Sequence, residues 1–151
     1  MKNKIKYLKQ QKNWTCGPAC MRIVLSAFNI NKSEKFLSQI MKTNKKTGTS
    51  FKQFKKTAKK FNLKYIEKDN ADIKQLKILI KNNFVVIVGY FLKDEKEEHY
   101  AVVKKISEDK IYLLDTEKGK NHSLIIEYFN KVWRANPKIK RWFIAIKDKP
   151  H

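Results

Sequence analysis

The first half of the chain carries apolar residues at the spacing of amphipathic helices. From Thr15 the run "TCGPACMRIVLSAF" forms one apolar face, with Thr15 as N-cap and Pro18 in the first turn. Ser33 opens a second helix, and a third begins near Thr49 or Ser50. The positions expected to face the core of the protein are Ala19, Ile23, Val24, Ala27, Phe28, Phe36, Leu37, Ile40, Met41, Phe51, Phe54, Ala58 and Phe61.

The second half of the chain changes to the patterns of β-strands. The continuous apolar run "FVVIVGYF" at 84–91 is typical of a strand buried on both faces. The segments "HYAVVKKI" and "KIYLLD" are joined by the turn "SEDK", which predicts an antiparallel hairpin. The remaining predicted elements are a strand at 63–68, a helix at 72–81, a helix at 124–133 and a strand at 140–147.

This order of elements predicts an α+β fold, with N-terminal helices packed on a mostly antiparallel sheet. No linker or repeat divides the sequence, and 151 residues suit a single domain over 1–151. No apolar run approaches the roughly 20 residues that would cross a bilayer, and the start "MKNKIKYLKQ" lacks the apolar core of a signal peptide. We therefore expect a soluble, cytoplasmic protein.

The formal charge of +21 raises the question of an anionic partner, such as nucleic acid or a membrane surface. Of the 35 basic residues, only Arg22, Arg134 and Arg141 are arginine, the residue that recognises bases and phosphates through two parallel hydrogen bonds. Lysine is scattered along every segment instead. The pattern favours a solvated lysine-rich surface over a specific nucleic-acid site, and it leaves electrostatic steering of acidic ligands open.

Both cysteines of the chain, Cys16 and Cys20, fall near the start of the first predicted helix. Residues four apart on a helix have poor geometry for a disulfide, so we expect free thiols. Cys16 begins the helix, where unpaired backbone N–H groups and the helix dipole favour the nucleophilic thiolate. Gly17 adds no side chain that would hinder a substrate carbonyl. Taken alone, however, Cys16 fits a small buried packing residue better.

His99 and Asp115 stand at the two ends of the predicted hairpin that its short turn brings together. A carboxylate that accepts a hydrogen bond from one imidazole nitrogen fixes the tautomer and leaves the other nitrogen for a thiol. Each residue also has an ordinary explanation, as a surface histidine and as a turn residue at a strand end. The sequence pattern alone does not place Cys16 beside this hairpin.

With these residues in order, the chain resembles the papain-like cysteine peptidases that remove double-glycine leaders from bacteriocins and related peptides. The key motif is "QQKNWTCGPAC", in which Gln10 precedes Cys16 by six positions. Further matching pieces are "GTS" at 48–50, the buried strand "VVIVGY", the strand "HYAVV" with its histidine, and an aspartate sixteen residues later. The resemblance covers nearly the whole chain.

The resemblance implies a papain-like fold and roles for four residues: Cys16 as nucleophile, His99 as base and later general acid, Asp115 as orienter of His99, and Gln10 as oxyanion-hole donor. Gln11 takes the last role if the register slips by one. Cys20 recurs in the family without acting as nucleophile and is expected to pack. The implied activity is cleavage of a leader peptide after Gly-Gly, without cofactor or metal, in partnership with a separate or fused ABC exporter.

Two positions depart from the pattern of this family. Members often have glycine before the histidine and proline after the aspartate, where this chain has Glu98 and Thr116. A carboxylate at Glu98 is expected to raise the pKa of His99 and to alter access to the site. No exporter sequence follows the peptidase-like segment in this chain.

Three other functions are weighed against peptide cleavage. The first is a module of the same fold that binds leader peptides without cutting them, and the second is nucleic-acid binding through the lysines. The third is a zinc site formed by Cys16, Cys20, His99 and His122, for which C-x-x-x-C on a helix is a weak signal. The presence of all four residues expected for catalysis favours the peptidase.

Overall fold

The computed structural model describes residues 4–150; positions 1–3 and 151 of the predicted domain lie outside the described residues. The helices of this part are α1 (Cys16–Ala27), α2 (Glu34–Ile40), α3 (Lys52–Lys60), α4 (Ile73–Lys81) and α5 (Ile126–Val132). The strands are β1 (Lys64–Lys68), β2 (Val85–Leu92), β3 (Glu97–Ile106), β4 (Lys110–Asp115), β5 (Gly119–Ile125), β6 (Arg134–Asn136), β7 (Ile139–Lys140) and β8 (Phe143–Lys147). Within residues 4–150, no helix has both the length and the apolar character to cross a membrane.

The main sheet has six strands in the order β1-β8-β2-β3-β4-β5, and every neighbouring pair is antiparallel. Strands β2, β3, β4 and β5 follow one another as a meander. The last strand, β8, lies between β1 and β2, so the C-terminal strand pairs with the first two strands of the chain. This arrangement confirms the predicted α+β class and the hairpin of β3 and β4.

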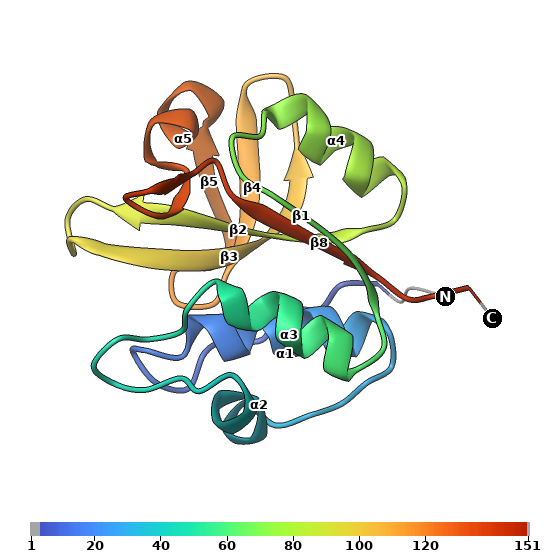
Figure 1. The fold of residues 1–151 in the computed structure, drawn as a ribbon. Coiled ribbons are helices and arrows are strands. Elements are labelled where there is room, and N and C mark those ends of the chain that lie inside the picture. The colour runs from blue at the N-terminus through green and yellow to red at the C-terminus, as the bar shows by residue number, and fades with distance from the viewer. Residues whose placement is uncertain (1–3, 151) are drawn as a thin grey trace.

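The sheet is covered on both faces; the N-terminal helices pack on it as predicted, and the sequence analysis did not assign a face to the two later helices. Figure 1 shows α1, α2 and α3 on one side and α4 and α5 on the other. Alternate residues of β2 enter the two cores: Val85 and Ile87 pack toward α1–α3, and Val86 and Val88 pack toward α4 and α5. The continuous apolar run of β2 is explained by this double burial.

Helix starts agree with their sequence signals at α2 and α4 and differ at α1. The side chains of Ser33 and Asp72 accept hydrogen bonds from first-turn backbone N–H groups of α2 and α4, as N-caps do. Thr15 occupies the N-cap position of α1 without capping it. Its hydroxyl instead contacts the buried carboxylate of Glu34 at 3.0 Å, which ties the segment before α1 to the start of α2.

The sequence did not predict β5, β6 or β7. Strand β5 has the polar sequence "GKNHSLI" and lies at the edge of the sheet, where its residues are exposed or half-buried, so it lacks a clear apolar alternation. It includes Leu124 and Ile125, which were predicted to begin a helix; α5 starts at Ile126. Strand β8 begins at Phe143 rather than 140, because Arg141 adopts a left-handed backbone with φ of 48°.

Candidate active site

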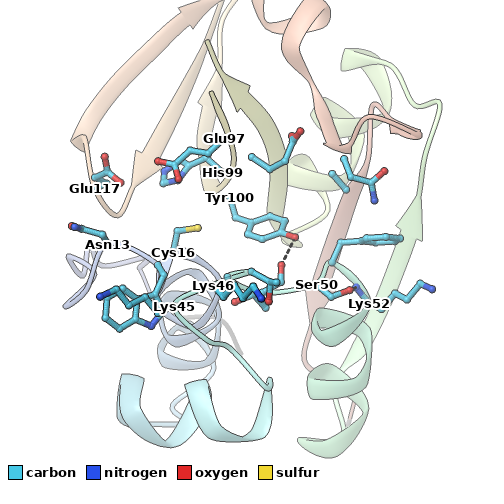
Figure 2. A pocket seen from close by; sticks show the side chains of 18 residues that line it. Asn13, Cys16, Lys45, Lys46, Ser50, Lys52, Glu97, His99, Tyr100 and Glu117 are labelled. Atoms are coloured by element: carbon cyan, nitrogen blue, oxygen red, sulfur yellow. Dashed lines mark hydrogen bonds between the residues drawn. The ribbon is translucent and has the colours of Figure 1, made fainter. Parts of the chain in front are cut away.

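An open pocket of about 930 Å³ lies where the N-terminal helices meet one end of the sheet. Cys16 and the loop lysines Lys45 and Lys46 line it from the helical side, and Glu97 and His99 line it from the sheet side (Figure 2). The side chains of the pocket therefore come from both halves of the chain. Cys16 and His99, which are far apart in the sequence, both line this pocket.

The two cysteines of α1 have different environments. Cys16 is the first residue of the helix and is half-buried, with its sulfur directed toward His99 in Figure 2. Cys20 lies one turn further along, is 0% exposed and belongs to the core under the sheet. Burial, followed by nearby negative charge, raises the pKa of the Cys20 thiol well above its ordinary value. Both thiols are free, and only Cys16 reaches the pocket.

His99 and Asp115 form a buried pair at the open end of the β3–β4 hairpin, away from its turn. The distance from His99 Nε2 to Asp115 Oδ1 is 2.9 Å. Asp115 Oδ1 also accepts the backbone N–H groups of Glu117 and Lys118, and Oδ2 accepts the hydroxyl of Tyr90. The carboxylate is thus held by four donors, which fixes its position and that of the imidazole ring.

The charges of this pair are stabilised by their mutual contact. Burial alone raises the pKa of Asp115, but the hydrogen bond and charge of His99, the Tyr90 hydroxyl and a backbone N–H lower it to about 2. Burial alone lowers the pKa of His99, but hydrogen bonds to Asp115 and to the Cys16 sulfur raise it to about 10. Because Nε2 faces Asp115, the nitrogen left for Cys16 is Nδ1. The raised pKa of His99 favours the protonated, cationic imidazole.

Gln10 lies beside the Asp115 end of the hairpin and is 8% exposed. Its Nε2 donates to the Lys12 carbonyl at 2.7 Å, and its Oε1 accepts from the Thr116 hydroxyl at 2.8 Å. The neighbouring Gln11 is exposed, and its backbone N–H donates to Glu34 at 2.9 Å. Of the two candidate glutamines, Gln10 is the one whose carboxamide is fixed next to the His99–Asp115 pair.

The comparisons with known proteins address the same segments. A family model described as the peptidase C39 family matches residues 4–136, which include the motif around Cys16 and the whole of the His99–Asp115 hairpin. The chain belongs to the peptidase C39 family. This membership implies a cysteine peptidase, and it confirms the family resemblance seen in the sequence.

The chain is similar in sequence to one characterised protein and in structure to two solved peptidase domains. The chain is 28% identical over 130 residues to the lactococcin-G-processing and transport ATP-binding protein LagD of Lactococcus lactis subsp. lactis, covering 85% of this chain and 18% of that protein. The peptidase domain of Streptococcus ComA, a bifunctional ABC transporter of a quorum-sensing pathway, superposes with a TM-score of 0.76 at 23% sequence identity. The match covers 96% of this chain and 99% of that chain. A double-glycine-motif protease from an AMS/PCAT transporter, in complex with the leader peptide, superposes with a TM-score of 0.74 at 16% sequence identity. The match covers 98% of this chain and 94% of that chain. The structural matches show a shared fold.

In this C39 domain, Gly17 has a packing role that the sequence did not indicate. A Cβ atom at Gly17 would lie 2.5 Å from Thr49 Oγ1, so the missing side chain makes room for Thr49. The Thr49 carbonyl accepts the Tyr100 hydroxyl at 2.8 Å. The "GTS" segment thereby packs between α1 and β3 and sets the wall of the pocket next to Cys16.

Glu98, which stands where the family often has glycine, forms an ion pair at the edge of the pocket. Its carboxylate accepts three hydrogen bonds from Arg134, at 2.7, 2.9 and 3.1 Å. The Arg134 guanidinium also lies 4.2 Å from the ring centre of Phe91. Glu98 is therefore balanced by a cation. The pKa of His99 is raised through Asp115 and Cys16 instead.

Two features of the C39 site were absent from the sequence analysis. Tyr90 lies directly opposite His99 in the β2–β3 register, and its hydroxyl contacts Asp115. A buried tyrosine needs a hydrogen-bond partner, so its place in the apolar run of β2 was an available signal. Glu34 is 2% exposed and accepts hydrogen bonds from Gln11 and Thr15, which holds the loop before Cys16. No local pattern marks Glu34 for this role.

The zinc alternative required four side chains to converge. Among residues 4–150, no group of three or more His, Cys, Asp or Glu side chains is placed to hold a metal ion. Cys20 is enclosed in the core, and the ring of His122 stacks near Tyr90 with centroids 6.4 Å apart. The described side chains thus offer no zinc ligand set.

Proposed function

We propose that this chain is a cysteine endopeptidase that cuts leader peptides after a Gly-Gly motif, with Cys16 as nucleophile, His99 as acid and base, Asp115 as orienter and Gln10 as oxyanion donor. One observation carries the proposal: a buried His99–Asp115 hydrogen bond of 2.9 Å stands beside a half-buried cysteine at the start of a helix. This is the arrangement that nucleophilic catalysis by a thiolate requires.

Acylation begins with attack of the Cys16 thiolate on the carbonyl carbon of the second glycine. The C–S bond forms as the carbonyl electrons move to oxygen, and the resulting oxyanion accepts from the Cys16 backbone N–H and from Gln10 Nε2. His99 then gives its proton to the leaving amine, and the C–N bond breaks. The products are a thioester on Cys16 and the released carboxyl-terminal peptide.

Deacylation uses the same residues in the reverse sense. Neutral His99 takes a proton from a water molecule, which attacks the thioester carbonyl. The C–S bond breaks, the leader leaves with a new carboxylate, and the thiolate and the imidazolium are restored. Asp115 keeps Nε2 of His99 occupied throughout, so Nδ1 serves both the sulfur and the water.

The substrate class is supported by the relatives. LagD processes and transports lactococcin G, ComA is a bifunctional ABC transporter, and the AMS/PCAT relative is a double-glycine-motif protease with bound leader. Glycines without side chains let an extended backbone reach the sulfur where larger residues would collide with the pocket walls. We place the domain in the cytoplasm, working with a fused or separate exporter at the inner face of the membrane. The charge of +21 would speed association with acidic leaders.

The decisive experiment is digestion of a small panel of leader peptides, with cut positions read by mass spectrometry. We expect cleavage just after the second glycine of an acidic amphipathic leader, and none by Cys16→Ala. Replacing either glycine with leucine should strongly lower kcat/KM, while higher salt should lower it modestly without moving the cut. Cys16-dependent cleavage at unrelated positions would reject the double-glycine substrate class. Tight leader binding without cleavage would instead favour a non-cleaving binding module.

A further inference from the structure

Thr116 follows Asp115 directly and is joined to Gln10 by two hydrogen bonds. Its hydroxyl donates to Gln10 Oε1 at 2.8 Å, and its carbonyl accepts the Gln10 backbone N–H at 2.9 Å. Thr116 is 0% exposed and Gln10 is 8% exposed, so water competes little for either bond. The two residues are 106 positions apart, and their contact connects the segment before Cys16 to the end of the hairpin.

We infer that Thr116 is a positioning residue that fixes which end of the Gln10 carboxamide faces the reacting carbonyl. The inference rests on the role proposed above for Gln10. A carboxamide has a donor end and an acceptor end, and half a turn about its last bond exchanges them. An Oε1 presented to the developing oxyanion would repel it, whereas an N–H would stabilise it.

Two contacts oppose the wrong orientation of Gln10. Nε2 donates to the Lys12 carbonyl, so a turned carboxamide would place Oε1 against that carbonyl, acceptor against acceptor. Lys12 belongs to the exposed stretch 11–13, but its carbonyl is held by the Thr15 hydroxyl at 2.9 Å and the Thr15 backbone N–H at 3.2 Å. Thr116 supplies the buried anchor, because its hydroxyl occupies Oε1 and leaves the second N–H of Nε2 unused by either contact.

Thr116 also occupies a rigid part of the site. The carboxylate of Asp115 accepts the backbone N–H groups of Glu117 and Lys118, at 3.0 and 2.8 Å, so the turn that carries Thr116 is closed by the orienter itself. The same turn therefore orients His99 through Asp115 and orients Gln10 through Thr116. A proline at this position, frequent in the family that the sequence resembles, has no hydroxyl to contribute.

The test compares Thr116→Val, which keeps the shape and removes the hydroxyl, with Thr116→Ser, which keeps the hydroxyl. We expect Thr116→Val to lower kcat for a double-glycine leader about tenfold, below the loss of a whole donor, and Thr116→Ser to restore most of it. Alkylation of Cys16 by iodoacetamide should keep its rate, because that reaction forms no oxyanion. In a Gln10→Ala background, Thr116→Val should add no further loss. The inference would be overturned if Thr116→Val lowered kcat as much in the Gln10→Ala background as in the wild type. It would also be overturned if Thr116→Val slowed the alkylation of Cys16 as much as it lowers kcat.

A second measurement needs no substrate. In proton–nitrogen spectra, the two side-chain N–H signals of Gln10 should be sharp and separate in the wild type and in Thr116→Ser, and shifted and broadened in Thr116→Val. Unchanged signals would overturn the inference whether or not a leader is cleaved. If the signals change as expected but the wild type cleaves no leader, the proposed function fails while the positioning by Thr116 stands.

Discussion

The hydroxyl of Tyr90 donates to Oδ2 of Asp115, the oxygen that the His99 ring does not use. Tyr90 is 2% exposed and faces His99 across the β2–β3 pair, with ring centroids 5.6 Å apart. Tyr90 therefore holds the Asp115 carboxylate by a hydrogen bond, and its ring packs edge-on against the imidazole of His99. Both oxygens of the carboxylate are occupied by residues of the sheet and the following turn, and neither depends on the helical half of the protein.

Tyr90→Phe is expected to weaken the orienter without removing any residue of the proposed triad. Loss of a hydrogen bond to a buried carboxylate costs about 1.5–3 kcal/mol of folding free energy, measured by urea denaturation. Because the Tyr90 bond helps to lower the pKa of Asp115, that pKa should rise toward 3.8. The matched control Tyr112→Phe, in a half-buried tyrosine of β4, should leave stability and kcat unchanged. Equal effects of both variants would contradict a role for the Tyr90 hydroxyl.

The two cysteines offer a matched pair of substitutions. Cys16→Ala should abolish leader cleavage and leave the fold intact, because only this sulfur lines the pocket. Cys20→Ala removes a sulfur from the closed core, so it should keep most activity and lose about 1–2 kcal/mol of stability. Turnover and thermal unfolding of both variants check this. A folded Cys20→Ala protein as inactive as Cys16→Ala would refute the assignment of the nucleophile.

Much of this arrangement was readable from local pattern. The turn "SEDK" and the alternation on each side of it predicted the hairpin, and the hairpin alone dictates that His99 and Asp115 meet. The contacts that complete the site are long-range. Thr116 reaches Gln10 across 106 positions and Tyr90 reaches Asp115 across 25, and no periodic pattern encodes such pairings. The Thr116–Gln10 contact depends on how the segment before α1 packs against the sheet, and the Tyr90–Asp115 contact depends on the strand order β2-β3-β4. A single sequence specifies neither.

Glu34 gives a test of the loop before Cys16. Glu34→Leu would leave the Gln11 backbone N–H without its acceptor and the Thr15 hydroxyl with the Lys12 carbonyl alone, at a cost of about 1–3 kcal/mol in unfolding free energy. We expect turnover to fall with it, because the same loop carries Gln10, while Glu34→Gln keeps one acceptor oxygen and loses less. The control is Lys35→Leu at the next, exposed position. Denaturation curves that are equal for Glu34→Leu and Lys35→Leu would argue against this role.

The His99–Asp115–Cys16 contacts predict a pH dependence of stability. The pKa of His99 is raised in the folded protein to about 10, from 6.5, so its contribution is fully present below pH 6.5 and is lost as pH rises through about 10. The stability difference between the wild type and His99→Gln should therefore shrink between these two values. Urea denaturation of both proteins at several pH values measures it. A constant difference over this window would show that His99 is not held as a cation.

The position of β8 means that the main sheet is completed only by the last strand of the chain. Cys16 is made early, but its partner His99 and the orienter Asp115 follow only in the second half of the chain. The sheet that carries them is completed last, because β8 pairs with both β1 and β2 and contains the final strand residues Phe143–Lys147. During synthesis the Cys16 thiol is therefore present before His99, its proposed base, and before the strand that completes the sheet.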